Sequence, residues 1–359
     1  MIPVTEPFMP PIEEYEHFLK GIWETKRLTN NGPLLKQLEQ KLKEYLGLKN
    51  LLYVSNGTIA LQIAIKALEL KDEVITTPFS YVATTSSLVW EGCEPVFVDI
   101  NQKTLNINPD LIEDAITEKT SGIMATHIFG NSCDIESIQT IADKHGLKVI
   151  YDAAHCFGTT YKGKSVFEYG DISTTSFQAT KLFHTIEGGA LITKDHELNQ
   201  QLIYMRNFGH TGPEPYLFNG VGINGKNSEY HAAMGLCNLL HIDEILDRRR
   251  KQCLMYDKLL IGFPVQNITI QKDSEWNYAY YPVIFESESR AITVKKALEQ
   301  NDIYPRRYFY PSLDTLDYVK SEKVNVSRSI SERILCLPLY FGLKDDEQEL
   351  IIETIVGEL

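Results

Sequence analysis

Short apolar runs alternate with helical patterns along the first two thirds of the chain. The runs are apolar at nearly every position, which is typical of strands buried on both faces of a parallel sheet. Strands of this kind, separated by helices, predict an α/β fold with a mixed, mostly parallel seven-stranded sheet flanked by helices. The last of them is a candidate for an antiparallel strand. The expected strands are residues 51–54, 73–76, 95–99, 122–128, 148–152, 173–177 and 189–193.

Apolar residues three and four positions apart predict the helices. Past Phe263-Pro264 the pattern changes to that of a smaller α/β unit, with strands expected at residues 267–271, 278–285 and 306–310. The chain is therefore expected to form a large domain over residues 1–240, including its N-terminal helices, and a small C-terminal domain over residues 241–359. The expected helices are 12–23, 34–46, 59–70, 81–90, 109–117, 135–145, 195–206, 229–259, 294–300 and 346–356.

Charge and cysteine content limit the function classes. The chain has 35 Lys and Arg against 48 Asp and Glu, a net charge of −13 over 359 residues. Binding to nucleic acid or to an anionic membrane needs clustered positive charge, so neither partner is expected. No apolar run reaches the ~18 residues of a membrane span, and the N-terminus does not resemble a signal peptide. The six cysteines are scattered without a Cys-x-x-Cys pair, so we expect reduced thiols, no metal site and a cytoplasmic location.

Candidate chemistry gathers where the expected strands end, which is where ligands collect in open α/β sheets. Ser55-Asn56-Gly57-Thr58 joins a strand to a helix, and its backbone N–H groups are suited to a phosphate, although a plain helix cap has the same pattern. Asp152 directly follows an apolar strand. Its carboxylate is a candidate partner for a protonated heterocycle, and a helix cap is the alternative.

Two further segments extend this set. Lys181 leaves a strand in a small, polar context and is a candidate to form a Schiff base with an aldehyde, whereas most lysines are simply solvated. The aromatic pair in Pro78-Phe79-Ser80-Tyr81 could supply a ring that stacks on a planar cofactor, although such aromatics more often belong to a core. A phosphate cradle, a stacking ring, an acid for a ring nitrogen and a reactive lysine together are what pyridoxal 5′-phosphate (PLP) requires.

At these residues the sequence resembles the DegT/StrS-type sugar-nucleotide aminotransferases, which are fold-type-I PLP-dependent transferases. The resemblance implies that Lys181 is the lysine that binds the cofactor aldehyde and that Asp152 pairs with the pyridinium nitrogen. It also implies cofactor contacts by Gly57, Thr58 and Ser176 at the phosphate, Tyr81 on the ring, His155 near the phenolic oxygen, and Gln178. The matching stretches are residues 28–33, 55–61, 78–84, 95–99, 152–158, 176–190, 222–236, 306–313 and 336–343.

The resemblance further implies a homodimer in which each subunit completes the other's site. Asn224 matches the asparagine that reaches the partner's cofactor phosphate, whereas the residues alone indicate a simple Asn-Gly turn. Lys226 and Arg307 are candidates for binding a substrate diphosphate, with solvated surface charges as the alternative. The remaining candidate substrate contacts are Asn30, His184 and Tyr310.

The activity implied is a ping-pong amino transfer. L-Glutamate converts PLP to pyridoxamine phosphate, which then aminates a dTDP-keto-6-deoxyhexose. The stretch 181–189 resembles enzymes that act on dTDP-keto-6-deoxyhexoses in general. The stretches 2–7 and 28–33 resemble enzymes that aminate dTDP-4-keto-6-deoxyglucose at C-4, giving dTDP-4-amino-4,6-dideoxyglucose. Residues 306–311 are shared with 3-aminotransferases, so a 3-keto substrate stays open. Two more functions stay open as well, a non-catalytic regulator that binds nucleotide sugars and a PLP enzyme that acts on amino acids. Lys181 argues against relatives that carry histidine there and act as dehydrases.

Overall fold

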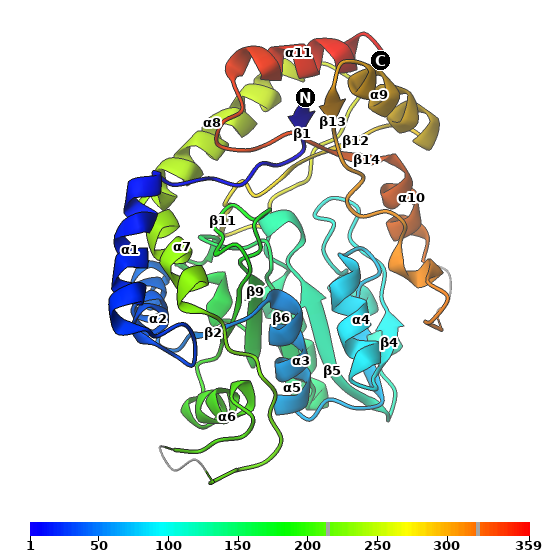
Figure 1. Ribbon diagram of the computed structural model, residues 1–359. Coiled ribbons are helices and arrows are strands. Elements are labelled where there is room, and N and C mark those ends of the chain that lie inside the picture. The colour runs from blue at the N-terminus through cyan, green and yellow to red at the C-terminus, as the bar shows by residue number, and fades with distance from the viewer. Residues whose placement is uncertain (213–215, 321–323) are drawn as a thin grey trace.

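The computed structural model describes residues 1–212, 216–320 and 324–359. Its largest feature is a seven-stranded sheet in the order β2-β10-β9-β6-β5-β3-β4 (Figure 1). Only β10 runs antiparallel to its neighbours, so the predicted mixed, mostly parallel sheet is confirmed. The strands are β2 (Leu52–Val54), β3 (Glu73–Thr76), β4 (Glu94–Phe97), β5 (Thr120–Thr126), β6 (Lys148–Asp152), β9 (Ile172–Ser176) and β10 (Gly189–Ile192).

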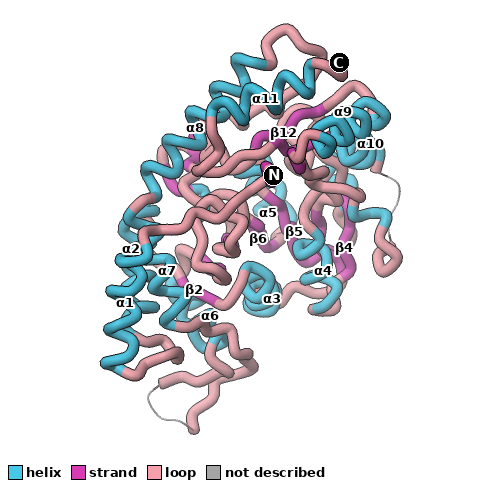
Figure 2. Tube along the Cα trace, turned by 45° about the horizontal axis from the view of Figure 1, so that its top comes forward, coloured by secondary structure: helices cyan, strands magenta, loops and turns pink. Residues whose placement is uncertain are grey.

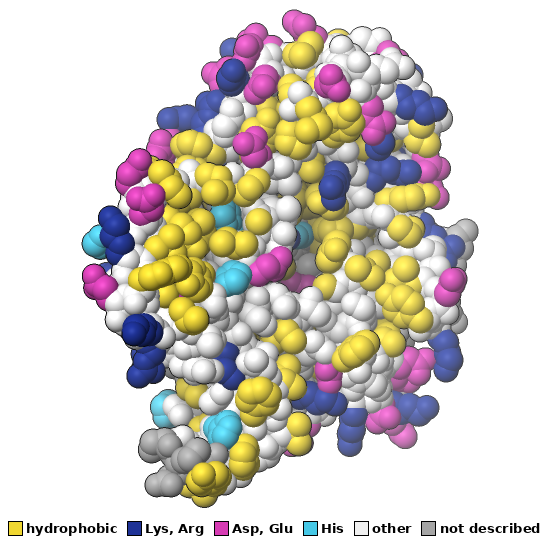
Figure 3. Space-filling view, viewed as in Figure 1, with side chains coloured by type: hydrophobic (Ala, Val, Ile, Leu, Met, Phe, Trp, Pro, Cys, Tyr) yellow, Lys and Arg dark blue, Asp and Glu magenta, His cyan; other side chains and the backbone are white. Residues whose placement is uncertain are grey.

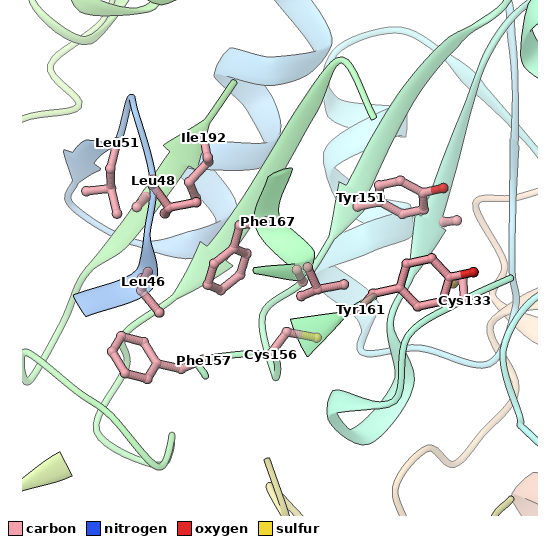
Figure 4. Packing of buried hydrophobic residues seen from close by; sticks show 14 of the residues in the cluster. Leu46, Leu48, Leu51, Cys133, Tyr151, Cys156, Phe157, Tyr161, Phe167 and Ile192 are labelled. Atoms are coloured by element: carbon pink, nitrogen blue, oxygen red, sulfur yellow. The ribbon is translucent and has the colours of Figure 1, made fainter. Parts of the chain in front are cut away.

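Helices cover both faces of this sheet, because its strands present apolar side chains to each side. Tyr53 belongs to one buried core, while its neighbours Leu52 and Val54 belong to the opposite one. Figure 4 shows part of the first core, including Tyr151 from the sheet and Leu46 from a covering helix. The helices are α2 (Pro33–Leu46), α5 (Ile135–His145) and α7 (Glu229–Leu240) on the first face, and α3 (Gly57–Ala67), α4 (Val82–Trp90) and α6 (His196–Arg206) on the second.

A second, smaller unit lies at the carboxyl edge of the sheet, and α8 runs into it from the end of α7 (Figures 1 and 2). Its centre is the antiparallel pair β12–β14, and β1 pairs in parallel with β13. The first residues of the chain therefore pack with this unit, while the division at residue 240 stays a prediction. The elements are β1 (Ile2–Pro3), β12 (Tyr281–Ile284), β13 (Ile303–Tyr304), β14 (Ile334–Leu337), α8 (Ile242–Leu259), α9 (Glu288–Gln300), α10 (Asn325–Arg333) and α11 (Asp345–Val356).

Smaller elements complete the fold. Helix α1 (Ile12–Thr25) packs against α7. A three-stranded sheet in the order β11-β7-β8 pairs residues 160–165 with residues 274–275. Its strands and the short 3₁₀ turns are β7 (Thr160–Tyr161), β8 (Lys164–Ser165), β11 (Ser274–Glu275), η1 (Pro109–Leu111), η2 (Glu113–Ala115), η3 (Ile128–Gly130), η4 (Val166–Glu168) and η5 (Leu313–Thr315).

Two helix predictions were wrong in detail. Residues 109–117 form the two 3₁₀ turns η1 and η2 in place of a helix. Ile112 is the fully buried anchor of this stretch, whereas a stable helix needs an apolar stripe. The helix expected over residues 229–259 is divided into α7 and α8 at His241, whose φ of −107° and ψ of 2° are not helical.

Two strand predictions were also wrong. Residues 267–271 form no strand, because the side chain of Asn131 takes over part of their backbone hydrogen bonding. Its amide accepts from Gln271 N at 2.8 Å and donates to Thr269 O at 3.0 Å. Residues 306–310 make a single isolated bridge, between Arg306 and Cys336, and then turn away from β14.

None of the helices in the described ranges has both the length and the apolar character that crossing a bilayer requires.

Candidate active site

The carboxyl ends of the central strands open into a cavity of about 390 Å³ beneath the smaller unit. Strand β6 ends in Asp152 and β9 in Ser176, so two neighbouring strands deliver polar side chains to the same edge. All the residues that were predicted to contact the cofactor of their own subunit line this cavity. These residues are Gly57, Thr58, Tyr81, Asp152, His155, Ser176, Gln178 and Lys181.

The start of α3 forms an anion cradle in the wall of the cavity. Asn56 caps the helix by accepting from Ile59 N at 2.8 Å. Gly57 and Thr58 are the first two residues of the helix. Their backbone N–H groups have no acceptor in the described part of the chain. A Cβ atom on Gly57 would lie 2.9 Å from Ser176 Cβ, so only glycine lets the serine hydroxyl approach these N–H groups. The cradle has the donors that a phosphate group needs.

Asp152 is buried, with 6% of its surface exposed. Its carboxylate accepts from Thr84 Oγ1 at 2.7 Å and from Ala154 N at 3.2 Å. Burial raises the pKa of Asp152, while these hydrogen bonds and the charge of Lys181 act in the opposite direction. No helix begins at the residues directly after Asp152, so this aspartate does not act as a helix cap. A protonated ring nitrogen would supply the positive partner that neutral hydrogen-bond donors cannot.

Lys181 lies in the irregular segment between β9 and β10 and is only partly exposed. Its Nζ is 3.5 Å from the hydroxyl of Tyr280. Burial lowers the pKa of Lys181, and the electrostatic influence of Tyr308, Asp152 and Tyr81 opposes that shift. A lowered pKa increases the neutral, nucleophilic fraction of the amine, which distinguishes this side chain from a solvated surface lysine.

Aromatic rings border the cavity above the carboxylate. The ring of His155 is parallel to that of Phe309, with centroids 5.9 Å apart and an interplanar angle of 4°. His155 Nδ1 is buried without a hydrogen-bond partner within the described residues, and burial lowers the pKa of its imidazole, which is therefore neutral near pH 7. Tyr81 is 59% exposed at the start of α4, with its ring accessible for stacking. Gln178 turns its side-chain oxygen to Thr180 N at 2.9 Å.

Three structural observations indicate that the cavity has the right groups to hold PLP. The cradle at Gly57 and Ser176 holds donors for a phosphate, and Asp152 is a buried carboxylate without a paired cation among the described side chains. His155 Nδ1 is a buried polar atom that lacks a partner there. A phosphorylated pyridine with a phenolic oxygen offers a complementary group for each of them.

Three candidate substrate contacts lie outside the cavity in the structure. Arg307 Nη2 pairs with Glu288 Oε1 at 2.8 Å, and its guanidinium lies 3.6 Å from the ring centroid of Tyr310. Neither Arg307 nor Tyr310 is among the lining residues. His184 is buried and interacts with Phe8 O at 2.7 Å, so its ring is held within the fold.

Asn30, Asn224 and Lys226 also lie outside the cavity of the single chain. Their two loops meet on the surface, where Thr29 Oγ1 donates to Asn227 O at 3.4 Å. Asn30 and Asn224 are exposed, and Lys226 Nζ lies 4.5 Å from the ring centroid of Phe208.

Several lining residues were not found from the sequence. Thr84, which donates to Asp152 but does not itself line the cavity, has a readable signal, because Thr84, Thr85 and Ser87 place buried hydroxyls on an otherwise apolar helix. The missed lining residues of the smaller unit come from its irregular parts, where no periodicity indicates the direction of a side chain. They are Tyr280, Arg306, Tyr308 and Phe309.

The chain is similar in sequence to proteins of one known family. Residues 12–356 match the DegT/DnrJ/EryC1/StrS aminotransferase family, and the chain belongs to that family. It is 44% identical to a dTDP-4-amino-4,6-dideoxy-D-glucose transaminase of Shigella dysenteriae, over 98% of this chain and 97% of the relative. It is 37% identical to a protein of the same name from Escherichia coli, over 100% of this chain and 99% of the relative.

Solved structures show the same fold. DesI, crystallised in the presence of its TDP-sugar product, superimposes with a TM-score of 0.93 at 28% identity, over 99% of this chain and 93% of that one. Spr1654 from Streptococcus pneumoniae in its PLP-form gives a TM-score of 0.92 at 26% identity, over 99% and 98% of the two chains. The protein is therefore a sugar aminotransferase of fold type I.

Proposed function

We propose that this enzyme uses PLP to transfer the amino group of L-glutamate to dTDP-4-keto-6-deoxyglucose, giving dTDP-4-amino-4,6-dideoxyglucose. The observation that carries the chemistry is the convergence of Lys181, Asp152 and the cradle at Gly57 on one cavity. The two relatives named for this product, aligned over almost the entire chain, support the choice of sugar.

The residues of the cavity would hold the cofactor in a fixed orientation. Ser176 Oγ and the N–H groups of Gly57 and Thr58 bind the phosphate, and Tyr81 stacks on the ring. Asp152 holds the proton of the ring nitrogen. When bound, PLP supplies an electron-accepting ring that stabilises negative charge on the carbon next to the amino group.

Lys181 then acts as the acid and base of the reaction. Its lowered pKa lets Nζ accept a proton from the amino-bearing carbon of the donor and return it during amination of the sugar carbon. Tyr280 OH, 3.5 Å away, positions this amine. The packed rings of His155 and Phe309 exclude water from the same region.

We also propose that the enzyme is a homodimer. Apolar side chains gather over α1 and α7 in Figure 3, and exposed Ile12, Trp23 and Leu28 belong to this part of the chain, with Trp23 67% exposed. An apolar face of this kind marks a protein interface. The exposed loop with Asn224 adjoins it, which supports a role for Asn224 at the partner's cofactor phosphate, with Asn30 and Lys226 beside it.

A cytoplasmic location is part of the proposal. All six cysteines are buried and unpaired in the structure, which suits a reducing compartment.

Product analysis tests the substrate. The purified enzyme with PLP, L-glutamate and dTDP-4-keto-6-deoxyglucose should yield a sugar whose amine NMR places at C-4. Product formation only after a 3,4-ketoisomerase is added would show a 3-aminotransferase instead. No reaction with either sugar, although the purified protein binds PLP, would contradict the proposal.

A further inference from the structure

The consecutive residues Arg306 and Arg307 differ in their contacts, because in the ranges that the structure describes only Arg307 has an ion-pair partner and only Arg306 lines the cavity. Arg307 is engaged by Glu288 Oε1 at 2.8 Å and by Glu332 O at 2.6 Å, away from the cavity. Arg306 lines the cavity and is exposed to it. Among the described residues no carboxylate lies within ion-pair distance of the Arg306 guanidinium. A cation in this position is available to an anionic ligand.

The backbone holds Arg306 in place. Its N–H donates to Cys336 O at 3.1 Å, and Cys336 N donates to Arg306 O at 2.7 Å, so the residue is bridged to the end of β14. Arg307 lies outside this bridge, at the start of a turn closed by the bond from Tyr308 N to Arg306 O at 3.1 Å, and its side chain contacts Glu288 and Glu332 in place of the cavity. The cation is therefore carried by an ordered part of the smaller unit.

Arg306 lies at the same part of the cavity as the reactive lysine. Its guanidinium carbon is 6.0 Å from the ring centroid of Tyr308. Burial raises the pKa of Tyr280 and of Tyr308, and the positive charge of Arg306 opposes both shifts. Tyr280 is in turn 3.5 Å from Lys181 Nζ, so two phenols connect the guanidinium to the amine.

The charges of the cavity limit the choice of ligand. The charged side chains that line it are Asp152, Lys181, Glu187 and Arg306. Two are acidic, and Lys181 is committed to the reaction. Arg306 is therefore the cation among these lining side chains that can hold a substrate anion through the reaction.

We propose that Arg306 binds the α-carboxylate of the amino-acid donor, an inference that rests on the proposed aminotransferase function. In an amino acid the carboxylate is bonded directly to the reacting carbon, so it must lie close to Lys181. In the nucleotide sugar the diphosphate is attached at C-1, across the ring from C-4, and lies farther from the lysine. A guanidinium also matches a carboxylate with two parallel hydrogen bonds.

Binding measurements on the PLP-loaded enzyme test this assignment. Titration calorimetry with 2-oxoglutarate and, separately, with thymidine diphosphate should be compared in the parent protein, Arg306→Gln, Arg306→Lys and Arg307→Gln. In Arg306→Gln we expect the Kd for 2-oxoglutarate to rise about 10- to 100-fold. The Kd for thymidine diphosphate should stay within about twofold. Arg306→Lys should lie between, because it keeps the charge and loses the two-pronged geometry.

Arg307→Gln is the matched control, since it removes the same charge one residue away and outside the cavity. Thermal melting of each variant separates lost binding from lost folding, and Arg306→Lys keeps the test valid if Arg306→Gln does not fold. Unchanged 2-oxoglutarate binding in Arg306→Gln would overturn the proposal, as would a loss confined to thymidine diphosphate or an equal loss in Arg307→Gln. Failure of the proposed function would be distinct, because it would show as no sugar amination by the parent protein.

Discussion

The floor and the roof of the cavity are built differently. The floor lies at or near the ends of sheet strands and at the start of α3, and it consists of Gly57, Asp152, Ser176 and Lys181. The roof comes from irregular segments of the smaller unit, and it consists of Tyr280, Arg306, Tyr308 and Phe309. Strand ends are fixed by the hydrogen bonds of neighbouring strands. The difference fits the proposed function, in which the floor holds the cofactor and the reactive lysine and the roof binds the amino-acid donor.

Contacts between the two units determine where the roof lies. Leu313 N donates to Pro78 O at 2.9 Å, which ties the segment after Phe309 to the loop before Tyr81. Asp99, just after β4, accepts from Val326 N and Ser327 N, each at 2.8 Å, at the start of α10. The roof is thus held by a few separate hydrogen bonds, in contrast to the continuous ladder below.

The largest effect is expected at the floor, from Lys181→Ala. Removing the amine takes away both the covalent hold on the cofactor and the acid and base of the reaction, so turnover should fall about 10,000-fold. Sodium borohydride should fix PLP to the parent protein and leave Lys181→Ala unlabelled, as mass spectrometry of the peptide would show. Lys194→Ala, outside the cavity, is the control. Substantial turnover in Lys181→Ala would show that the floor does not carry the reactive amine.

The next effect is expected from Asp152→Asn. An amide fills the same space but cannot balance a protonated ring nitrogen, so kcat/KM should fall on the order of 100-fold. Thr84→Val removes only the 2.7 Å hydrogen bond to the carboxylate and should cost about 10-fold. Steady-state kinetics on both variants checks the ranking. If Thr84→Val were the more damaging change, the charge of Asp152 would not be its main contribution.

The smallest effect is expected in the roof, from Tyr280→Phe. Burial lowers the pKa of Lys181, and the phenol oxygen that accepts from its ammonium form favours the charged state. Loss of that acceptor should lower the pKa of Lys181 further. The amine would then become neutral, and reactive, at a lower pH.

Acetylation of Lys181 in the cofactor-free protein, followed by mass spectrometry across pH, measures this shift. The midpoint of reactivity should move to lower pH in Tyr280→Phe and stay in place in Tyr304→Phe, which alters an exposed tyrosine near Asp302. A midpoint that is unchanged or higher in Tyr280→Phe would show that the phenol does not support the ammonium form.

The two arginines show how far prediction from the sequence reached. Asp152 was predicted as a site residue because a carboxylate directly after an apolar strand is costly to bury unless it has a cationic or hydrogen-bonded partner. Arg307 was chosen over Arg306 although the two are adjacent, because the side to which each points depends on the bridge to Cys336. His184 follows Lys181 by three positions in the same irregular segment, yet its ring is held by Phe8, which is far away in the sequence.

By itself, the sequence determined the sheet, the helices that cover it and the reactive groups at its edge. These follow from local patterns, since apolar runs form buried strands and polar residues cannot continue them. Only the tertiary structure decided which side chains close the cavity from above. Those side chains are placed by contacts between residues remote in the chain, such as Arg306 with Cys336 and Leu313 with Pro78, and no short-range periodicity records such contacts.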